Sequence, residues 1–470
     1  MNTSKMLLAT VAVGAMIAAA PVEASAKAKS TSTQSSEIEM LKAQIAELKA
    51  MVVKQAAAPA AAVPPTLAAD VAKLKVKVEA IEDGQIDSGF GGLKFSGFLD
   101  PTYVYNERAD RGDFIFLNDS GGPTNDLAAD SWGYMNPNFG GVTILLEKQI
   151  DTDLAATVKL RPYKSPNNGW VEEAFMSIGI GEGRTVVVGK RNSFNGYESV
   201  DAAAGKNVTH NLLYDFGGPL EMTGAGVDFN ALGMDWKTTI GNMNSQRDLK
   251  GAESRGFHWR GDYEVSEFFG VGVSGMHGKL DGQGYNYVGL DTWYTKGEWN
   301  INTQLEVGQH KHMAFNGGKA SHVGASVLAS YMLGEGWEAV ARVDYLDDHK
   351  NGGWRGYVEE TGGGECLGLA DFEADPSGAT AAAACGDHRN GFGPQLGFDT
   401  ASGLWGITNS SRGAKRSAIT LGMNYQLHEN ALLKLEVRFD RADIYAFYDF
   451  ESGNFKKSNT LFAAQTVIKF

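Results

Sequence analysis

Long apolar runs, cysteines and positive charge are all scarce in this chain of 470 residues. Beyond the N-terminal region, no stretch approaches the roughly 18 continuous apolar residues of a membrane-spanning helix, which excludes a helical membrane protein. The formal net charge is −14, with 42 Lys and Arg against 56 Asp and Glu, so we expect no nucleic-acid partner. Neither G-x-S-x-G nor H-E-x-x-H occurs, and we therefore expect no enzyme, no metal site and no cofactor.

The N-terminal region carries the features of an export signal. Lys5 precedes an apolar run from Met6 to Ala20, and Ala24-Ser25-Ala26 offers a small-x-small cleavage site. The run is shorter than the roughly 20 residues that a spanning helix needs, and no cysteine follows it to accept a lipid. We predict a signal peptide over residues 1–26 and a mature chain that begins near Lys27.

The chain has two cysteines, Cys366 and Cys385, and both follow this signal. Exported proteins meet an oxidising environment, in which cysteine pairs persist as disulfides. We predict that the two cysteines form one disulfide in the longest loop, residues 346–417, on the extracellular side. Closing a loop of about 19 residues contributes roughly 3 kcal/mol in the chain-entropy model.

Two short heptad patterns precede the main domain. Their apolar residues alternate at spacings of three and four, which is the seam of a coiled coil. They are Ile38, Leu41, Ile45, Leu48 and Val52, then Leu67, Val71, Leu74, Val78 and Ile81. An Ala/Pro linker over residues 56–65 separates them, because proline breaks a helix. We predict a periplasmic coiled-coil segment over residues 27–88; the alternative is a helical spacer that does not assemble.

From Leu93 onward the apolar pattern has a period of two, which is the side-chain period of a β-strand. In residues 257–265, for example, apolar side chains alternate with charged ones, so that one face of the strand is apolar and the other is polar. Residues 299–307 and 433–440 repeat this pattern. The 59 Gly, 23 Phe, 16 Tyr and 9 Trp suit short strands, tight turns and the aromatic girdles of membrane barrels.

We count 16 strand segments, and their connections alternate in length. Connections after even-numbered segments are short, such as residues 151–153, 181–183 and 232–233. Those after odd-numbered segments are mostly long, and the longest span residues 106–138, 190–221 and 346–417. An up-and-down barrel produces this alternation when one rim faces the periplasm and the other the outside. The predicted fold is all-β: a transmembrane up-and-down antiparallel β-barrel of about 16 strands over residues 89–470, preceded by the short α-helical coiled coil.

Several segments resemble the OmpL-like β-barrel porins. They are Leu93 to Asn106, Gly196 to Glu198, and Asn211 to Phe216 running on to Pro219 and Thr223-Gly224. The resemblance covers about residues 93–300 and implies a barrel in the bacterial outer membrane, surrounded by outer-membrane lipid. The coiled coil is similar to that of the DcaP-like porins, which are trimeric uptake channels, and implies a homotrimer with its helices in the periplasm.

Strand parity assigns charged side chains of both signs to the lumen. The assigned residues are Lys159, Arg161, Glu173, Lys237, His258, Arg260, Asp262, Glu264, Asp291, Glu306, Glu338, Arg342, Asp344, Lys434, Glu436, Arg438 and Asp440. A barrel of about 16 strands holds a water-filled lumen, so such charges are structurally expected and need not set selectivity. Among them we expect Arg260, Asp262, Glu264, Arg342 and Arg438 to line the pore.

The third long loop is the candidate constriction, because porin-type barrels commonly fold this loop inward. It carries Glu198 and Asp201, while Lys159, Arg161 and Arg191 belong to nearby strands. An acidic loop opposed to a basic wall would produce a transverse field that favours polar, oriented solutes. The alternative is a loop that packs over the outer mouth.

The predicted function is passive diffusion or uptake of small hydrophilic solutes through a water-filled lumen. One alternative is an envelope tether that works through its coiled coil, and another is an outer-membrane hydrolase. Conductance in a planar bilayer separates a channel from a tether with a plugged lumen, and turnover of lipid or ester substrates would reveal a hydrolase. His310, His312 and His322 share one predicted outer loop, but they match no metal-binding spacing.

Overall fold

The computed structural model describes residues 92–108, 111–116, 140–162, 171–218, 221–243, 253–353, 391–401, 403–449 and 451–470. These residues belong to one compact unit, Gly92–Phe470. The predicted signal peptide, the coiled-coil segment, Cys366 and Cys385 lie outside the described residues. Within the described part of the chain, no helix is both long and apolar enough to cross a membrane.

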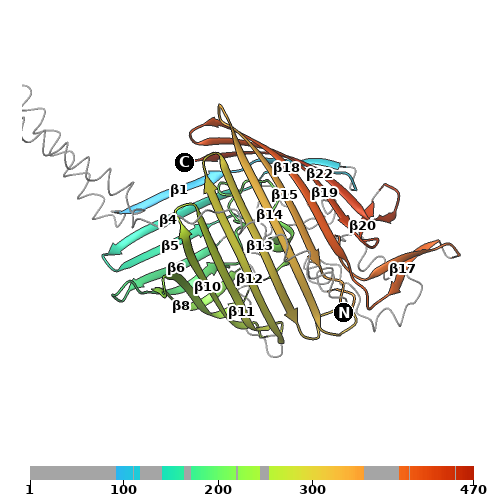
Figure 1. Ribbon diagram of the computed structural model, residues 1–470, viewed down its shortest axis with the longest axis horizontal. Coiled ribbons are helices and arrows are strands. Elements are labelled where there is room, and N and C mark those ends of the chain that lie inside the picture. Colours follow the sequence, from blue (N-terminus) through green and yellow to red (C-terminus); the bar gives the residue numbers. More distant parts are fainter. Residues whose placement is uncertain are drawn as a thin grey trace, which may run out of the picture. The chain divides into compact units, whose positions relative to one another are not determined.

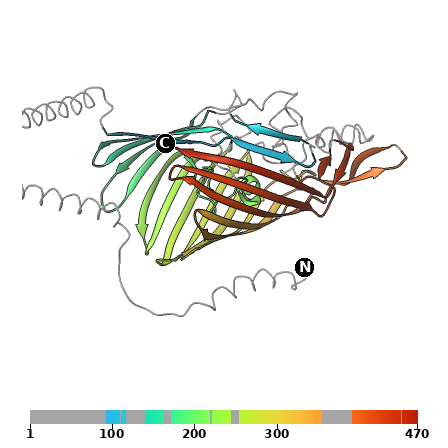
Figure 2. The same cartoon turned by 90° about the horizontal axis from the view of Figure 1, so that it is seen from above.

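The described strands form a closed antiparallel barrel. Eighteen of them join a single sheet. β1 (Leu93–Leu99) pairs with β4 (Val142–Asp151) on one side and with β22 (Ser458–Lys469) on the other, so the first and last strands close the ring. Figures 1 and 2 show the strands arranged around a central interior. Two places in the ring are each shared by two strands, so the barrel has 16 strand positions, as the sequence predicted.

The other full-length strands of the ring follow in order along the chain. They are β5 (Leu154–Leu160), β6 (Val171–Gly179), β7 (Thr185–Asn192), β8 (Glu221–Ala231), β9 (Met234–Met243), β10 (Arg255–Ser266), β11 (Phe269–Leu280), β12 (Gln283–Lys296), β13 (Trp299–His310), β14 (Ala320–Gly334), β15 (Trp337–Asp347), β18 (Lys415–His428) and β19 (Ala431–Ala442). Two hairpins stand outside the ring, namely β16 (Gln395–Asp399) with β17 (Leu404–Asn409) and β20 (Phe447–Asp449) with β21 (Asn454–Lys456). Both interrupt connections at the long-loop rim.

The first strand of the ring is broken where proline occurs. Asp100-Pro101 separates β1 from β2 (Thr102–Asn106), and β2 pairs with β3 (Arg111–Ile115) beyond the break. Proline has no amide hydrogen to donate to a strand ladder. The carboxylate of Asp100 accepts the backbone N–H groups of Gly140 at 2.7 Å and Gly141 at 2.9 Å. These bonds tie the break to the residues just before β4.

The predicted alternation of side chains is confirmed. Tyr263 and Trp299 point outward and are 46% and 48% exposed, as the lipid-facing residues of a barrel must be. Arg260, Glu306 and Arg438 point inward and are buried. The barrel therefore has an apolar exterior and a charged interior, which is the reverse of a soluble protein.

Short turns connect the strands at one rim. The turn between β8 and β9 consists of Leu232 and Gly233, and both residues have a positive φ, 58° and 74°. A two-residue turn with two positive φ values twists in the same sense as its flanking strands. A positive φ is ordinary for a glycine such as Gly233 and unusual for a leucine. The long connections lie at the opposite rim, so the predicted alternation of short and long connections is confirmed.

Candidate functional site

The third long loop lies inside the barrel and not over its mouth. We call its described part, residues 193–218, the inner loop. It leaves β7 and contains the short helix α4 (Leu212–Phe216). Figure 2 shows this green segment within the ring of strands. Backbone carbonyls of the inner loop accept hydrogen bonds from side chains of β10, β15 and β19, so the loop crosses the lumen.

The first part of the inner loop runs from β7 toward β14. Arg260 on β10 donates from Nη1 to the carbonyl oxygen of Phe194 at 2.9 Å. Further along, the hydroxyls of Tyr197 and of Ser326 on β14 are 2.7 Å apart. Because these partners lie on well-separated strands, they hold this part of the loop across the lumen.

The two acids of the inner loop touch the wall directly. Asp201 Oδ1 lies 2.5 Å from Lys159 Nζ and 3.1 Å from Arg161 Nη2. Glu198 Oε2 lies 3.4 Å from Arg342 Nη1 on the opposite side of the barrel. Burial raises the pKa of the Glu198 carboxyl above its ordinary value, although Arg342 opposes this. Glu198 therefore does not face Lys159 and Arg161, contrary to the sequence-based expectation. The reason is that the loop passes Arg342 on β15 before it reaches Lys159 on β5.

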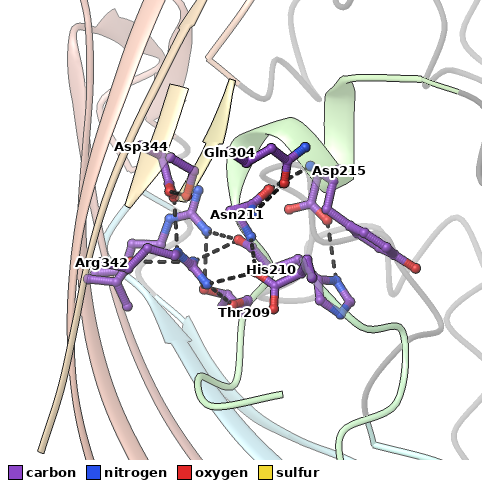
Figure 3. A network of polar contacts seen from close by, with 12 residues as sticks. Thr209, His210, Asn211, Asp215, Gln304, Arg342 and Asp344 are labelled. Carbon is purple, nitrogen blue, oxygen red and sulfur yellow. Dashed lines mark hydrogen bonds and ion pairs between the residues drawn. The ribbon is translucent and has the colours of Figure 1, made fainter. Parts of the chain in front are cut away.

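Two arginines on the opposite side of the barrel bind the backbone of the inner loop, and Figure 3 shows one of them, Arg342, beside Thr209 and His210. Arg342 on β15 donates to the carbonyl oxygens of Thr209 at 2.6 Å and His210 at 2.7 Å. Arg438 on β19 donates to the His210 carbonyl at 2.8 Å. Both guanidinium groups are fully buried. Carbonyl oxygens that would otherwise lack partners inside the barrel are thereby satisfied.

The neighbouring charges of β19 bind the same segment. Glu436 Oε2 accepts the backbone N–H of Val208 at 2.6 Å. Lys434 Nζ donates to the carbonyl oxygens of Ala202 and Gly205, both at 2.6 Å. The carboxylate accepts amide hydrogens and the ammonium donates to carbonyl oxygens. Each of these charges of β19 therefore contacts the oppositely charged end of a backbone dipole in the loop. We call the inner faces of β14, β15, β18 and β19 the anchoring wall.

Helix α4 fills the lumen beside the anchoring wall. Asn211 caps it, because the side chain of Asn211 accepts the N–H of Tyr214 at 2.7 Å. Phe216 packs against Phe392 from the longest loop, with ring centroids 4.8 Å apart. The guanidinium of Arg416 lies 5.3 Å and 5.5 Å from these two rings. This side of the lumen is thus packed like a protein core and leaves little room for solute.

A cavity of about 630 Å³ remains on the other side of the inner loop. We call the strands that face it, β6, β7, β9, β10 and β12, the open wall. The lining residues are Glu173, Phe175, Arg191, Asn192, Ser193, Phe194, Asn195, Gly196, Glu198, Asp235, Lys237, Arg260, Asp262, Glu264 and Trp293. Charged residues of both signs thus meet the space that a solute could enter.

Two arginines of the open wall are already paired. Arg191 makes two bonds to the carboxylate of Asp228, at 3.0 Å and 2.8 Å. Arg260 makes two bonds to Asp291, at 2.8 Å and 2.7 Å, and a third to Asp262 at 2.8 Å. Such two-point contacts fix the geometry of a guanidinium strongly. Both arginines therefore present little net charge to the cavity.

Three other charged residues of the open wall face the cavity with their side chains exposed. They are Asp235, Lys237 and Glu264. Lys237 lies directly opposite Arg260 across β9 and β10, and Asp235 lies opposite Asp262. Strand parity predicted that Lys237 and Glu264 face the lumen. Asp235 was not among the predicted residues, although it has the same parity as Lys237.

The three histidines of the proposed outer loop do not share a loop. His310 is the last residue of β13 and its Nε2 lies 2.8 Å from the carbonyl oxygen of Leu280. His322 lies within β14, where its Nε2 is 3.3 Å from Glu306. The loop prediction was wrong here, because strand alternation continues through both residues. Within the described residues, no group of His, Cys, Asp and Glu is arranged to hold a metal ion.

A closed barrel with an apolar exterior, a charged interior and an inward loop defines a β-barrel channel. The chain belongs to the family described as putative beta-barrel porin-2, OmpL-like, whose model matches residues 92–470. This match extends well past the segments that carried the resemblance in the sequence. The protein is thus an outer-membrane porin for passive diffusion and not an enzyme.

The barrel is also similar to solved porin structures. OmpT of Vibrio cholerae in its trimer form is 10% identical, with 80% of this chain and 99% of that chain covered and a TM-score of 0.48. The channel DcaP of Acinetobacter baumannii is 9% identical, with 80% and 97% covered and a TM-score of 0.47. OmpF of Salmonella typhi, in complex with daunomycin, is 13% identical, with 80% and 97% covered and a TM-score of 0.43. No curated protein matches the chain.

Proposed function

We propose that this porin passes small hydrophilic solutes with a preference for cations. The path is the cavity between the inner loop and the open wall. The observation that supports the proposal is the unequal use of charge on the two walls. Arg342, Arg438 and Lys434 of the anchoring wall are buried against loop carbonyls, so they are not available to an anion in the pore.

The cavity lining contains more carboxylates than cations. The carboxylates are Glu173, Glu198, Asp235, Asp262 and Glu264, and the cations are Arg191, Lys237 and Arg260. Asp228 and Asp291 pair with two of these three cations from positions just outside the lining. Glu198 belongs to the inner loop and pairs with Arg342. The remaining charged residues of the lining, taken together with Asp228 and Asp291, have a negative net charge.

The size of the expected preference follows from Coulomb's law. A unit charge about 8 Å from a passing ion contributes about 0.5 kcal/mol in water, which is about twofold in the local concentration of that ion. Low-dielectric walls focus the field and increase this value. Asp235 and Glu264 together outweigh Lys237, so a modest preference for cations is the expected result.

Liposome swelling tests the proposal with solutes of similar size and opposite charge. Lysine and glutamate differ little in volume, so a difference in their entry rates reports charge and not sieving. We expect lysine to enter faster, and we expect the difference to shrink at high salt because salt screens exposed charges. Equal rates at low salt, or faster entry of glutamate, would contradict the proposed preference.

We further propose that the protein is a homotrimer whose coiled-coil segment lies in the periplasm. The heptad pattern of residues 38–81 supports self-association, and OmpT of Vibrio cholerae is described in a trimer form. Helices as short as these are marginal alone, so we assign the oligomeric state to the barrels. Native mass spectrometry should find trimers for the full chain and for a variant that lacks residues 27–88. A monomeric full chain would contradict the proposal.

A further inference from the structure

One aromatic side chain of the cavity differs from its neighbours because no cation covers it. The lining contains three aromatic residues, Phe175, Phe194 and Trp293. The guanidinium of Arg191 lies 5.7 Å from the ring centroid of Phe175 and 4.9 Å from that of Phe194. Among the residues that the structure describes, no cation lies over the ring of Trp293, which is half-buried. Its indole is therefore the aromatic surface of this cavity that remains open to a cationic solute.

A glycine on the neighbouring strand lets this indole lie against the wall. Trp293 on β12 pairs with Gly270 on β11. A methyl group added at Gly270 would lie 2.1 Å from Cζ2 and 2.3 Å from Cε2 of the indole, so any larger residue would displace the ring. One face of the ring thus covers the backbone of β11, and the opposite face is the one that a solute in the cavity can reach.

A carboxylate lies on the other side of the same glycine. Glu264 on β10 pairs with Gly270, so Glu264 and Trp293 flank that glycine on the inner face of the barrel. Glu264 is exposed and, within the described part of the chain, makes no ion pair. An aromatic face and an uncompensated negative charge therefore border the same part of the cavity.

The next row of inward-facing residues is also acidic. Asp262 and Asp291 lie on either side of Gly272, and they share the single guanidinium of Arg260. One cation against two carboxylates leaves this row with a negative formal charge. Lys237 lies opposite Arg260 in the row beyond, which is four residues, or roughly 13 Å, from Glu264 along β10. The part of the wall around the indole therefore favours positive charge.

We propose that Trp293, Glu264 and Asp262 form a binding site for an organic cation that carries a quaternary or alkylated ammonium group. The inference rests on the proposed cation path and names the class of solute that binds within it. The negative face of the indole attracts such a cation, and its alkyl groups lose water against the ring. A small hydrated cation lacks those alkyl groups, and a neutral sugar lacks the charge that the two carboxylates attract.

Choline and its uncharged isostere, in which carbon replaces the nitrogen atom, test the site because they share one shape and differ in charge. Saturation-transfer difference NMR on the purified full-length porin in a nonionic detergent measures the dissociation constant of each probe. We expect the wild type to bind choline roughly tenfold more tightly than the isostere. Trp293→Leu should weaken choline binding roughly fivefold, whereas Trp293→Phe, which keeps an aromatic ring, should weaken it less.

A matched control replaces a tryptophan of the outer face. Trp299 is 48% exposed on the lipid-facing side, so Trp299→Leu should bind choline as the wild type does. Equal binding of choline and its isostere to the wild type would overturn the site, and so would equal choline affinities of Trp293→Leu and Trp299→Leu. Heat-modified migration on gels confirms that each variant is a folded barrel.

The reversal potential of the wild type separates failure of this site from failure of the proposed function. A cation-selective channel that binds both probes alike would retain the proposed preference for cations and contradict only the organic-cation site. An anion-selective channel would contradict the proposed preference itself, and the inference that rests on it would fall with it.

Discussion

The two walls of this lumen carry similar residues and use them differently. On the anchoring wall, arginine, lysine and glutamate side chains end on the backbone of the inner loop, and the bound loop excludes solute from that side. On the open wall, Asp235, Lys237 and Glu264 end in a cavity. A charged residue that points into a barrel is thus structural or functional depending on whether the loop reaches it.

The largest predicted effect breaks the anchoring wall at Arg342. Arg342→Met leaves the Thr209 carbonyl without its guanidinium partner, removes one of the two arginines that bind the His210 carbonyl, and breaks the ion pair with Glu198, which should cost about 3–5 kcal/mol in stability of the folded barrel. Single-channel conductance should also rise or become noisy as the loop loosens. Urea unfolding in detergent micelles measures the first effect and planar bilayers the second.

The control for Arg342 is Lys237→Met on the open wall. Lys237 is exposed, so its loss should change stability by less than about 0.5 kcal/mol. If the two variants unfolded at the same urea concentration, the distinction between the walls would be lost.

A second prediction tests whether the anchoring side is packed as a core. Phe392 is fully buried against Phe216 and Arg416, so Phe392→Ala should destabilise the barrel by about 3 kcal/mol. Phe398, in the nearby hairpin, is 48% exposed, and Phe398→Ala should cost well under half as much. Thermal unfolding followed by circular dichroism compares the two, and similar melting temperatures would show that α4 does not pack as described.

The smallest predicted effect concerns the acids of the inner loop. Asp201 and Glu198 each form an ion pair with a cation of the barrel wall. Asp201→Asn and Glu198→Gln should therefore each lower the free energy of unfolding by about 1 kcal/mol. Their effect on ion selectivity should be smaller than that of open-wall substitutions. A larger shift in reversal potential from Asp201→Asn than from Glu264→Gln would reverse our assignment of the two walls.

The sequence predicted the barrel well because the pattern that identifies a strand lies within a few consecutive residues. A period of two in segments such as residues 257–265 and 433–440 identifies both the strand and the face, and short turns such as Leu232-Gly233 give the topology. The short connections predicted at residues 151–153, 181–183 and 232–233 lie between β4 and β5, between β6 and β7, and between β8 and β9. Parity likewise placed Arg260, Arg342 and Arg438 inside.

The path of the inner loop could not be predicted in the same way. Glu198 meets Arg342 and Lys434 meets Gly205 across more than a hundred residues of sequence, and no periodic pattern reports such contacts. The contact of Asp201 with Lys159 and Arg161 was anticipated because these strands are close along the chain. The prediction for the histidines was also wrong. His322 was expected in an outer loop, but it lies within β14.

The reversal potential in a salt gradient tests the central claim most directly. Wild-type channels should be cation-selective, the double variant Asp235→Asn, Glu264→Gln should be roughly two- to fivefold less so, and Lys237→Gln should shift the potential in the opposite direction. All three side chains lie exposed in the cavity, so the barrel should fold in each case. Anion selectivity in the wild type, or identical reversal potentials in all three proteins, would contradict a cation path along the open wall.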